Sequence, residues 1–266
     1  MPSTNPLAVA WSRGRATTGI WLAGEGRASA EVLARAGFDY VVVDLQHGLL
    51  STSGALEVMR ALAGTESVVL CRAPSNDAAA IGRLLDHGAR GVIVPMVNDA
   101  DDARRAVAAC RYAPHGSRSW GPTRARLVAE PAAFASPAAA DASVLCIPMI
   151  ETTEAVANLD EIAAVEGIDA LYVGPSDLAI SMRLGPAVDH PDERFTTALA
   201  AVRERCAAHG LGAGIHADPE HARRRLDEGF SMVTVTSDLD ALRRGALAAL
   251  DALARPDDAP PPTSAD

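Results

Sequence analysis

The segment LLDHGARGVIVPMVND, at residues 84–99, decides the fold. It leads from the end of an amphipathic helical pattern through Gly88 into the apolar run 91–95, and Asp99 then opens the next helical pattern. Gly88 suits the left-handed position that ends many helices, and Asp99 is a favourable N-cap residue. A short apolar strand between two helices is the repeating unit of a parallel α/β fold.

The same alternation recurs along the chain of 266 residues. Short apolar, β-branched runs predict eight strands, at 18–22, 40–44, 67–71, 91–95, 144–150, 170–173, 212–216 and 232–235. Amphipathic stretches predict eight helices, at 29–36, 53–63, 76–86, 99–111, 153–164, 192–209, 219–227 and 238–253. This repetition predicts a closed (β/α)8 TIM barrel in one domain, residues 1–253, with an open doubly wound sheet as the alternative.

Two segments break the alternation. Residues 112–143 contain four prolines and predict a long, irregular connection of the kind that serves as a functional or interface loop. Residues 254–266 are polar and rich in proline, which predicts a disordered tail.

The charge composition excludes several classes of protein. The formal net charge is −10, which argues against a nucleic-acid-binding protein, because contacts to phosphate require clustered positive charge. All 24 basic side chains are arginine, and the chain has no lysine. This excludes Schiff-base catalysis by a lysine, pyridoxal-phosphate anchoring and the Walker A phosphate loop.

The four cysteines show neither paired C-x-x-C spacing nor metal-site spacing with a histidine. We expect reduced thiols in a cytoplasmic protein. No signal peptide is evident, and no apolar run has the length of a transmembrane helix, so we expect no membrane partner.

Two carboxylates follow neighbouring predicted strands at their carboxyl ends, where the active sites of TIM barrels lie. Glu151 interrupts the run after CIPMI, and Asp177 lies in the turn GPSD. Two carboxylates together with waters suit Mg²⁺ or Mn²⁺ and leave positions open for substrate oxygens. The alternative is a pair of solvated loop carboxylates.

Two basic side chains end other strands. His47 follows Asp44 by three residues, so a carboxylate could orient its ring, although a structural histidine is the alternative. Arg72 could hold a carboxylate or stabilise an enolate, and the alternative is a salt bridge at the barrel rim. Trp21, at the end of the first strand, is by itself more typical of a core residue.

The order of these motifs resembles the HpcH/HpaI aldolase family, the metal-dependent pyruvate aldolases. The resemblance extends from about residue 19 to residue 250. It rests on GIWL at 19–22, AGFDYVVVDLQHG at 36–48, RAPSND at 72–77, LLDHGARGVIVPMVND at 84–99, RYAPHGSRSWG at 111–121, MIETTEAVANLDEI at 149–162 and GIDALYVGPSDLA at 167–179.

The resemblance implies a role for each matching position. Metal-binding carboxylates match Glu151 and Asp177, with Mg²⁺ or Mn²⁺ expected and Co²⁺ an option. The arginine that contacts the pyruvyl group matches Arg72. The acid/base histidine matches His47, and acids near it match Asp44 and Asp86.

The resemblance also implies a substrate pocket. An aromatic residue of the pocket matches Trp21, and the loop whose backbone amides receive the substrate carboxylate matches Gly174, Pro175 and Ser176. His216, where relatives often carry an apolar residue, is expected to tune the choice of aldehyde; a rim histidine bonded to a neighbour is the alternative. The family often has Glu in place of Gln46 and Gln in place of Met149.

The expected reaction is the reversible cleavage of a 4-hydroxy-2-oxo acid into pyruvate and an aldehyde, through a metal-stabilised enolate. A citrate-lyase-β-like CoA-ester lyase and a non-catalytic binding barrel are the alternatives. The family further implies a homo-oligomer, a hexamer built as a trimer of dimers, in which the last helix, 238–253, is swapped between subunits.

Overall fold

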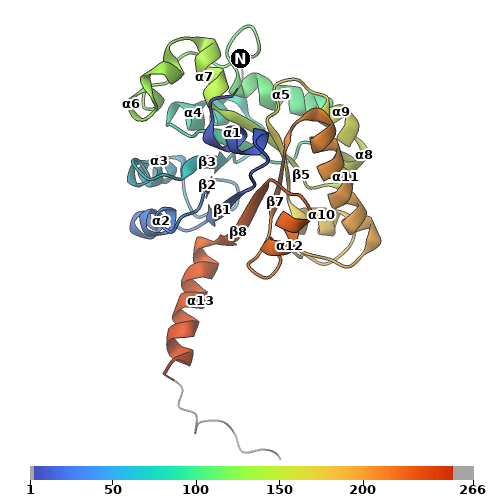
Figure 1. The fold of residues 1–266 in the computed structure, drawn as a ribbon. Helices are drawn as coiled ribbons and strands as arrows, with labels where there is room; N and C mark the ends of the chain where they lie inside the picture. The colour runs from blue at the N-terminus through green and yellow to red at the C-terminus, as the bar shows by residue number, and fades with distance from the viewer. Residues whose placement is uncertain (1–2, 254–266) are drawn as a thin grey trace, which may run out of the picture.

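The computed structural model describes residues 3–253 and shows the closed parallel barrel (Figure 1). Each strand pairs with the next in the sequence, and the last strand pairs with the first. The strands are β1 (Thr17–Leu22), β2 (Tyr40–Asp44), β3 (Val68–Arg72), β4 (Gly91–Val94), β5 (Leu145–Ile150), β6 (Ala170–Val173), β7 (Gly212–His216) and β8 (Met232–Ser237). The predicted TIM barrel is confirmed, and every predicted strand is present within three residues of its predicted ends.

Most of the helices cover the outside of the barrel (Figure 1). Those that match predicted helices are α2 (Arg27–Ala34), α3 (Thr52–Ala61), α4 (Ala78–Asp86), α5 (Ala100–Cys110), α8 (Thr153–Ala157), α9 (Leu159–Ala163), α11 (Glu193–His209), α12 (Ala222–Asp227) and α13 (Asp238–Asp251). The single helix predicted at 153–164 is two helices, which meet at Asn158.

The sequence did not predict the remaining helices. The connection expected to be irregular contains α6 (Ala125–Val128), the 3₁₀ turn η1 (Pro131–Phe134) and α7 (Pro137–Ser143). Two further short helices are α1 (Pro6–Ser12) and α10 (Pro175–Ser181). The tail predicted to be disordered, 254–266, lies outside the described residues.

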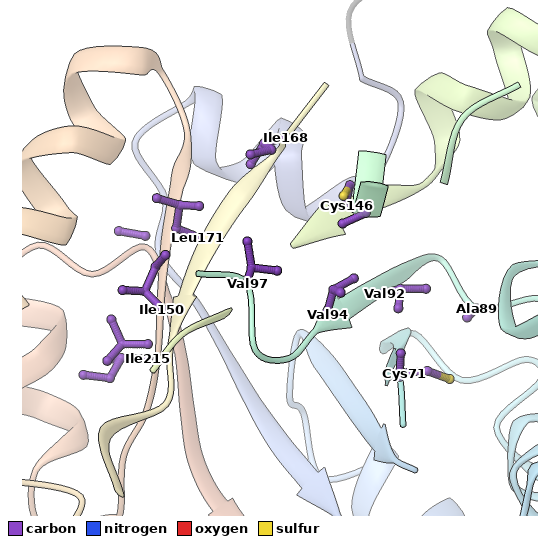
Figure 2. Packing of buried hydrophobic residues seen from close by; sticks show 14 of the residues in the cluster. Cys71, Ala89, Val92, Val94, Val97, Cys146, Ile150, Ile168, Leu171 and Ile215 are labelled. Atoms are coloured by element: carbon purple, nitrogen blue, oxygen red, sulfur yellow. The ribbon is translucent and has the colours of Figure 1, made fainter. Parts of the chain in front are cut away.

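The core has two layers. The outer layer packs strand side chains against the surrounding helices, and Figure 2 shows part of it, including Val92, Val94 and Leu171. The inner layer fills the barrel itself with the side chains that point inward, among them Trp21, Leu70 and Tyr172. A filled interior means that substrate can reach the barrel only at its ends.

Two buried tyrosines converge inside the barrel. The hydroxyls of Tyr40 and Tyr172 lie 3.0 and 2.6 Å from the Thr234 hydroxyl, so each polar group has a partner in the core. Gly19 leaves room for the Tyr40 ring, because a Cβ at this position would lie 2.1 Å from a ring carbon. The interior is therefore fixed by hydrogen bonds and by packing.

The amino-terminal helix covers the end of the barrel at which the strands begin. The Asn5 side chain caps α1 and also donates to the carbonyls of Arg90 and Ser143, which lie just before β4 and β5. Leu7 extends into the inner layer. The other end of the barrel, where the strands terminate, remains open for a site.

The last helix, α13, extends away from the barrel (Figure 1). Asp238 is its only buried residue among those described, while Leu239, Leu242, Leu247 and Leu250 are exposed. Within residues 3–253, no helix is both long enough and apolar enough to cross a membrane.

Candidate active site

A pocket of about 210 Å³ opens at the carboxyl ends of the strands. Its lining is Trp21, His47, Arg72, Met149, Tyr172, Gly174, Pro175, Ser176, Asp177 and His216. The structure thus brings together side chains predicted from five separate strand ends. A larger hollow of about 530 Å³ lies where the strands begin, but it contains none of the predicted site residues. We therefore place the candidate site at the carboxyl ends.

A buried ion pair lies at the ends of β2 and β3. Arg72 donates from Nε to Asp44 Oδ1 at 2.8 Å and from Nη2 to Oδ2 at 2.5 Å. Asp44 Oδ1 also accepts from the backbone amides of Gln46 and His47. Burial acts to raise the pKa of Asp44, but the hydrogen bonds and charge of Arg72 outweigh it and hold this pKa below its usual value.

This arrangement changes the predicted role of Asp44. The sequence suggested that its carboxylate orients the His47 ring, but the contacts of Asp44 are with the Arg72 guanidinium and with the His47 backbone. The carboxylate therefore shapes the turn that carries His47 and holds Arg72 in place. The His47 side chain is exposed at the rim of the pocket.

Glu151 is buried at the end of β5 and is held from two sides. Its Oε1 accepts the backbone N–H of Met96 at 2.6 Å, and its Oε2 lies where a Cβ on Gly174 would approach to 2.8 Å. Burial raises the pKa of Glu151 above its usual value, and the charge of Asp177 adds to this effect. Glycine at 174 therefore allows the turn after β6 to approach the Glu151 side chain at the end of β5.

Met96 has an unusual backbone for a residue with a side chain. Its φ is +56°, in the left-handed region, and half of its side chain is exposed. This conformation directs its amide to Glu151. The contact was not predicted from the sequence, because nothing in the residue types marks a methionine with positive φ.

The turn at 174–176 differs in detail from the expectation. The Gly174 amide donates to the Ile150 carbonyl at 3.2 Å, and Pro175 has no N–H. The Leu178 amide donates to the Gly174 carbonyl. The amides of Ser176 and Asp177, at the start of α10, are thus the ones that lack an intrahelical acceptor and can bind a substrate oxygen.

An aromatic group forms another part of the pocket. The Trp21 ring lies 5.7 Å from Tyr172 and 5.3 Å from His216, and the guanidinium carbon of Arg72 lies 5.0 Å above its face. Burial, helped by the charge of Arg72, lowers the pKa of His216 to about 4. The His216 ring is therefore neutral at neutral pH.

Comparison with known proteins identifies the family. A family model described as HpcH/HpaI aldolase/citrate lyase matches residues 17–245. The chain belongs to the HpcH/HpaI aldolase/citrate lyase family. This confirms the resemblance found in its motifs.

Individual members of the HpcH/HpaI family are similar over nearly the whole chain. A hydroxypyruvate/pyruvate aldolase of Rhizorhabdus wittichii is 40% identical, over 91% of this chain and 96% of the relative. A 5-keto-4-deoxy-D-glucarate aldolase of Escherichia coli is 37% identical, over 90% and 93%. A solved family structure from Burkholderia cenocepacia has a TM-score of 0.86 and 31% identity, over 94% and 99%. The protein is thus an enzyme, an aldolase of the carbon–carbon lyase class.

One predicted residue of this HpcH/HpaI aldolase lies elsewhere. Asp86 ends α4 and pairs with Arg118 at 2.7 Å, in a separate hollow lined in part by Arg83 and Ser117. The helix runs from the carboxyl ends of the strands toward their beginnings, so its last residue is carried away from His47. Within a single chain, Asp86 therefore does not line the pocket.

Tyr172 is a pocket residue that the sequence analysis missed. It lies within an apolar strand, where an inward-pointing residue and an outward-pointing residue look alike. Side chains alternate between the two faces of a strand, so the residue two positions before Gly174 is expected to face the same side as Gly174. This rule would have identified Tyr172 as a residue of the pocket.

Proposed function

We propose that this aldolase cleaves 4-hydroxy-2-oxo acids reversibly into pyruvate and an aldehyde with the help of a divalent cation. The observation that carries the proposal is a pair of carboxylates at neighbouring strand ends. Asp177 lines the small pocket together with Arg72, and Glu151 is buried directly behind Gly174 of the lining, close enough for the charge of Asp177 to raise its pKa. The relative named a hydroxypyruvate/pyruvate aldolase supports a 2-oxo acid of this size as one product, with hydroxypyruvate as a second candidate.

The residues present fit a hard divalent cation. Glu151 and Asp177 supply oxygen donors, which Mg²⁺ and Mn²⁺ prefer, and Co²⁺ accepts the same set. Arg72 is paired with Asp44, and its charge acts on Glu151 only as a smaller effect that lowers the pKa against burial. Residues 3–253 hold no cluster of three or more His, Cys, Asp and Glu side chains suited to a metal, and the remaining ligands would be waters and substrate oxygens. When bound, the cation would supply Lewis-acid polarisation of the 2-keto group.

The side chains around the acid pair have separate tasks in the proposed reaction. Arg72, fixed by Asp44, directs its remaining N–H groups toward the 2-keto oxygen and stabilises the negative charge that develops there. The free amides of Ser176 and Asp177 bind the substrate carboxylate. His47, directly or through one water, accepts the C4 hydroxyl proton as the C3–C4 bond breaks, and returns a proton in the condensation direction.

The pocket favours this reaction over CoA-ester cleavage. A volume of about 210 Å³ lies below the roughly 300–1,000 Å³ of pockets that hold drug-sized ligands. That space suits a small oxo acid and a short aldehyde, whereas an acyl-CoA would need an extended surface beside the mouth.

The test is a panel assay on the purified protein. We expect pyruvate release from 4-hydroxy-2-oxo acids in the presence of Mg²⁺ or Mn²⁺. Acyl-CoA esters form the second arm of the assay. Turnover of the CoA esters alone would favour the lyase alternative, and no turnover in either arm would favour a binding protein.

We further propose a cytoplasmic homo-oligomer, a hexamer formed as a trimer of dimers. The four cysteines are free and buried, as expected in a reducing compartment. The exposed leucines of α13 form an apolar face on a helix that leaves its own barrel, which supports a swap of this helix onto a second copy. Light scattering on the full chain and on a chain that ends before α13 would test this assembly.

A further inference from the structure

The pocket has two walls of different chemistry. On one side, the segment after β6 contributes Asp177 and the turn at 174–176, and Glu151 at the end of β5 lies buried directly behind Gly174. On the other side, β7 and β1, with β8 between them, contribute His216 and Trp21, whose rings meet edge to face at an interplanar angle of 77°. The first wall is anionic and hydrogen-bonding, and the second is aromatic with a single polar ring.

His216 is a polar group whose ring has no hydrogen-bond partner within residues 3–253. Its polar neighbours are directed to other groups, since Arg72 is held by Asp44 through Nε and Nη2 and the Tyr172 hydroxyl is bonded to Thr234. A half-buried imidazole left open toward a pocket can bind a polar group of a ligand at little cost in desolvation.

The charge state of His216 indicates which kind of ligand group the ring can bind. Its lowered pKa, about 4, keeps the ring neutral, so that one nitrogen donates a hydrogen bond and the other accepts one. A hydroxyl group also donates and accepts, and therefore matches either nitrogen. A carboxylate only accepts hydrogen bonds, so it could pair with the N–H of the neutral ring but not with its acceptor nitrogen.

We propose that His216 selects aldehydes with a hydroxyl group next to the carbonyl, by hydrogen-bonding that hydroxyl. The inference rests on the proposed function, in which the 2-oxo acid occupies the wall of Glu151 and Asp177. The incoming aldehyde must then lie against Trp21 and His216. The volume of about 210 Å³ leaves room for a two- or three-carbon aldehyde beside the oxo acid.

The experiment compares two acceptors of similar size, glycolaldehyde and acetaldehyde, each with pyruvate and Mn²⁺. The quantity measured is the ratio of kcat/KM for the two aldehydes, which does not depend on overall activity. We expect the ratio to fall about tenfold in His216→Leu and in His216→Phe, as the loss of one neutral hydrogen bond predicts. In His216→Asn, which keeps a donor and an acceptor, most of the preference should remain.

His209→Leu is the matched control, because His209 is exposed at the end of α11, far from the pocket lining. Its ratio should equal that of the wild type. Either apolar variant at 216 with a wild-type ratio would overturn the inference, and if one of them fails to fold the other decides.

Exchange of the pyruvate methyl protons with deuterium separates this inference from the proposed function. The exchange requires no aldehyde and reports the pyruvate half of the reaction alone. A wild-type protein with neither exchange nor aldol product overturns the proposed function. An active wild type whose ratio is unaffected by the loss of His216 overturns only the inference.

Discussion

Arg72 and Asp44 are joined by two hydrogen bonds, with Nε 2.8 Å from Oδ1 and Nη2 2.5 Å from Oδ2, at the ends of adjacent strands. The side chains are nearly buried, so the geometry of the guanidinium is fixed before any substrate binds. A planar fork can bridge both carboxylate oxygens and still present its other N–H groups to the pocket.

This geometry predicts that Arg72→Lys does not preserve activity. Lysine keeps the charge but offers a single ammonium, which cannot serve Asp44 and a substrate oxygen in the same way. We expect kcat/KM for pyruvate release to fall at least about 100-fold, as when one donor to a developing oxyanion is lost. The control is Arg60→Lys, at an exposed ion pair with Glu57 on α3, which should stay near the wild type. A loss of only a few-fold for Arg72→Lys would reduce the residue to a rim salt bridge.

The acid pair predicts dependence on a divalent cation. Treatment with a strong chelator should abolish turnover, and Mg²⁺, Mn²⁺ or Co²⁺ should restore it. Glu151→Gln and Asp177→Asn should each weaken Mn²⁺ binding, measured by calorimetry, because each removes an anionic ligand from a site with two. Glu154→Gln, an exposed carboxylate three residues from Glu151, is the control and should bind Mn²⁺ as the wild type does. Full activity after exhaustive chelation would contradict the proposal.

The absence of lysine predicts the outcome of a trapping experiment. Aldolases stabilise the carbanion with a lysine imine or with a metal, and only the second route is open to a chain whose 24 basic residues are all arginine. Borohydride with pyruvate should therefore leave the mass of the barrel unchanged and its activity intact after the reagents are removed. A covalent pyruvyl adduct within the barrel would refute the metal route.

The fold could be predicted well because one signal repeats. Each strand is a short apolar run that is followed by a capped helix. A short run that is apolar at every position is typical of a parallel strand buried on both faces. The errors fall where the signal is weak. Helix α1 has seven residues, too few for a clear helical pattern. Helix α10 begins in the Gly-Pro turn that also carries Asp177, where the sequence predicts a loop. In both places a proline, which breaks a helix when it lies in the interior, occupies the first position of the helix.

The site was predictable as a set of strand ends but not as a set of contacts. Glu151, Arg72 and His216 could be assigned to one face because the barrel places all strand ends together. That Asp44 binds Arg72 instead of the His47 ring depends on side-chain reach across β2 and β3. That Met96 supplies an amide to Glu151 depends on a single backbone angle. Neither feature is coded by residue spacing.

The backbone of Met96 leads to a prediction about cation binding. At a φ of +56° a β-branched side chain is strongly disfavoured, whereas glycine is tolerated. Met96→Val should lower the free energy of unfolding by about 1–2 kcal/mol and weaken Mn²⁺ binding several-fold, because the amide turns away from Glu151. Met96→Gly keeps the angle and should keep Mn²⁺ affinity within about twofold. Equal affinities for the valine and glycine variants would show that this amide does not position Glu151.

The last prediction concerns the stability of the protein in acid. The pKa of His216 is lowered to about 4, first by burial and then by the charge of Arg72, while the carboxylates of Asp240, Asp44 and Asp218 oppose the shift. Between pH 6.5 and pH 4 the unfolded chain therefore carries a proton on this ring that the folded chain does not. The free energy of unfolding must fall as the pH falls through this window, because protons then favour the unfolded state.

For His216 alone the loss between pH 7.5 and pH 4.5 is about 2–3 kcal/mol, at about 1.4 kcal/mol for each tenfold difference in proton affinity. Urea denaturation of the wild type and of His216→Leu at the two pH values isolates this contribution, since the other titrating groups are common to both proteins. The leucine variant should lose less stability than the wild type by this amount. His209→Leu, at the exposed end of α11, should follow the wild type. Parallel losses in the wild type and in His216→Leu would mean that folding does not lower the pKa of His216. A fraction of the rings would then be protonated near neutral pH, and the argument from a fully neutral ring would fail.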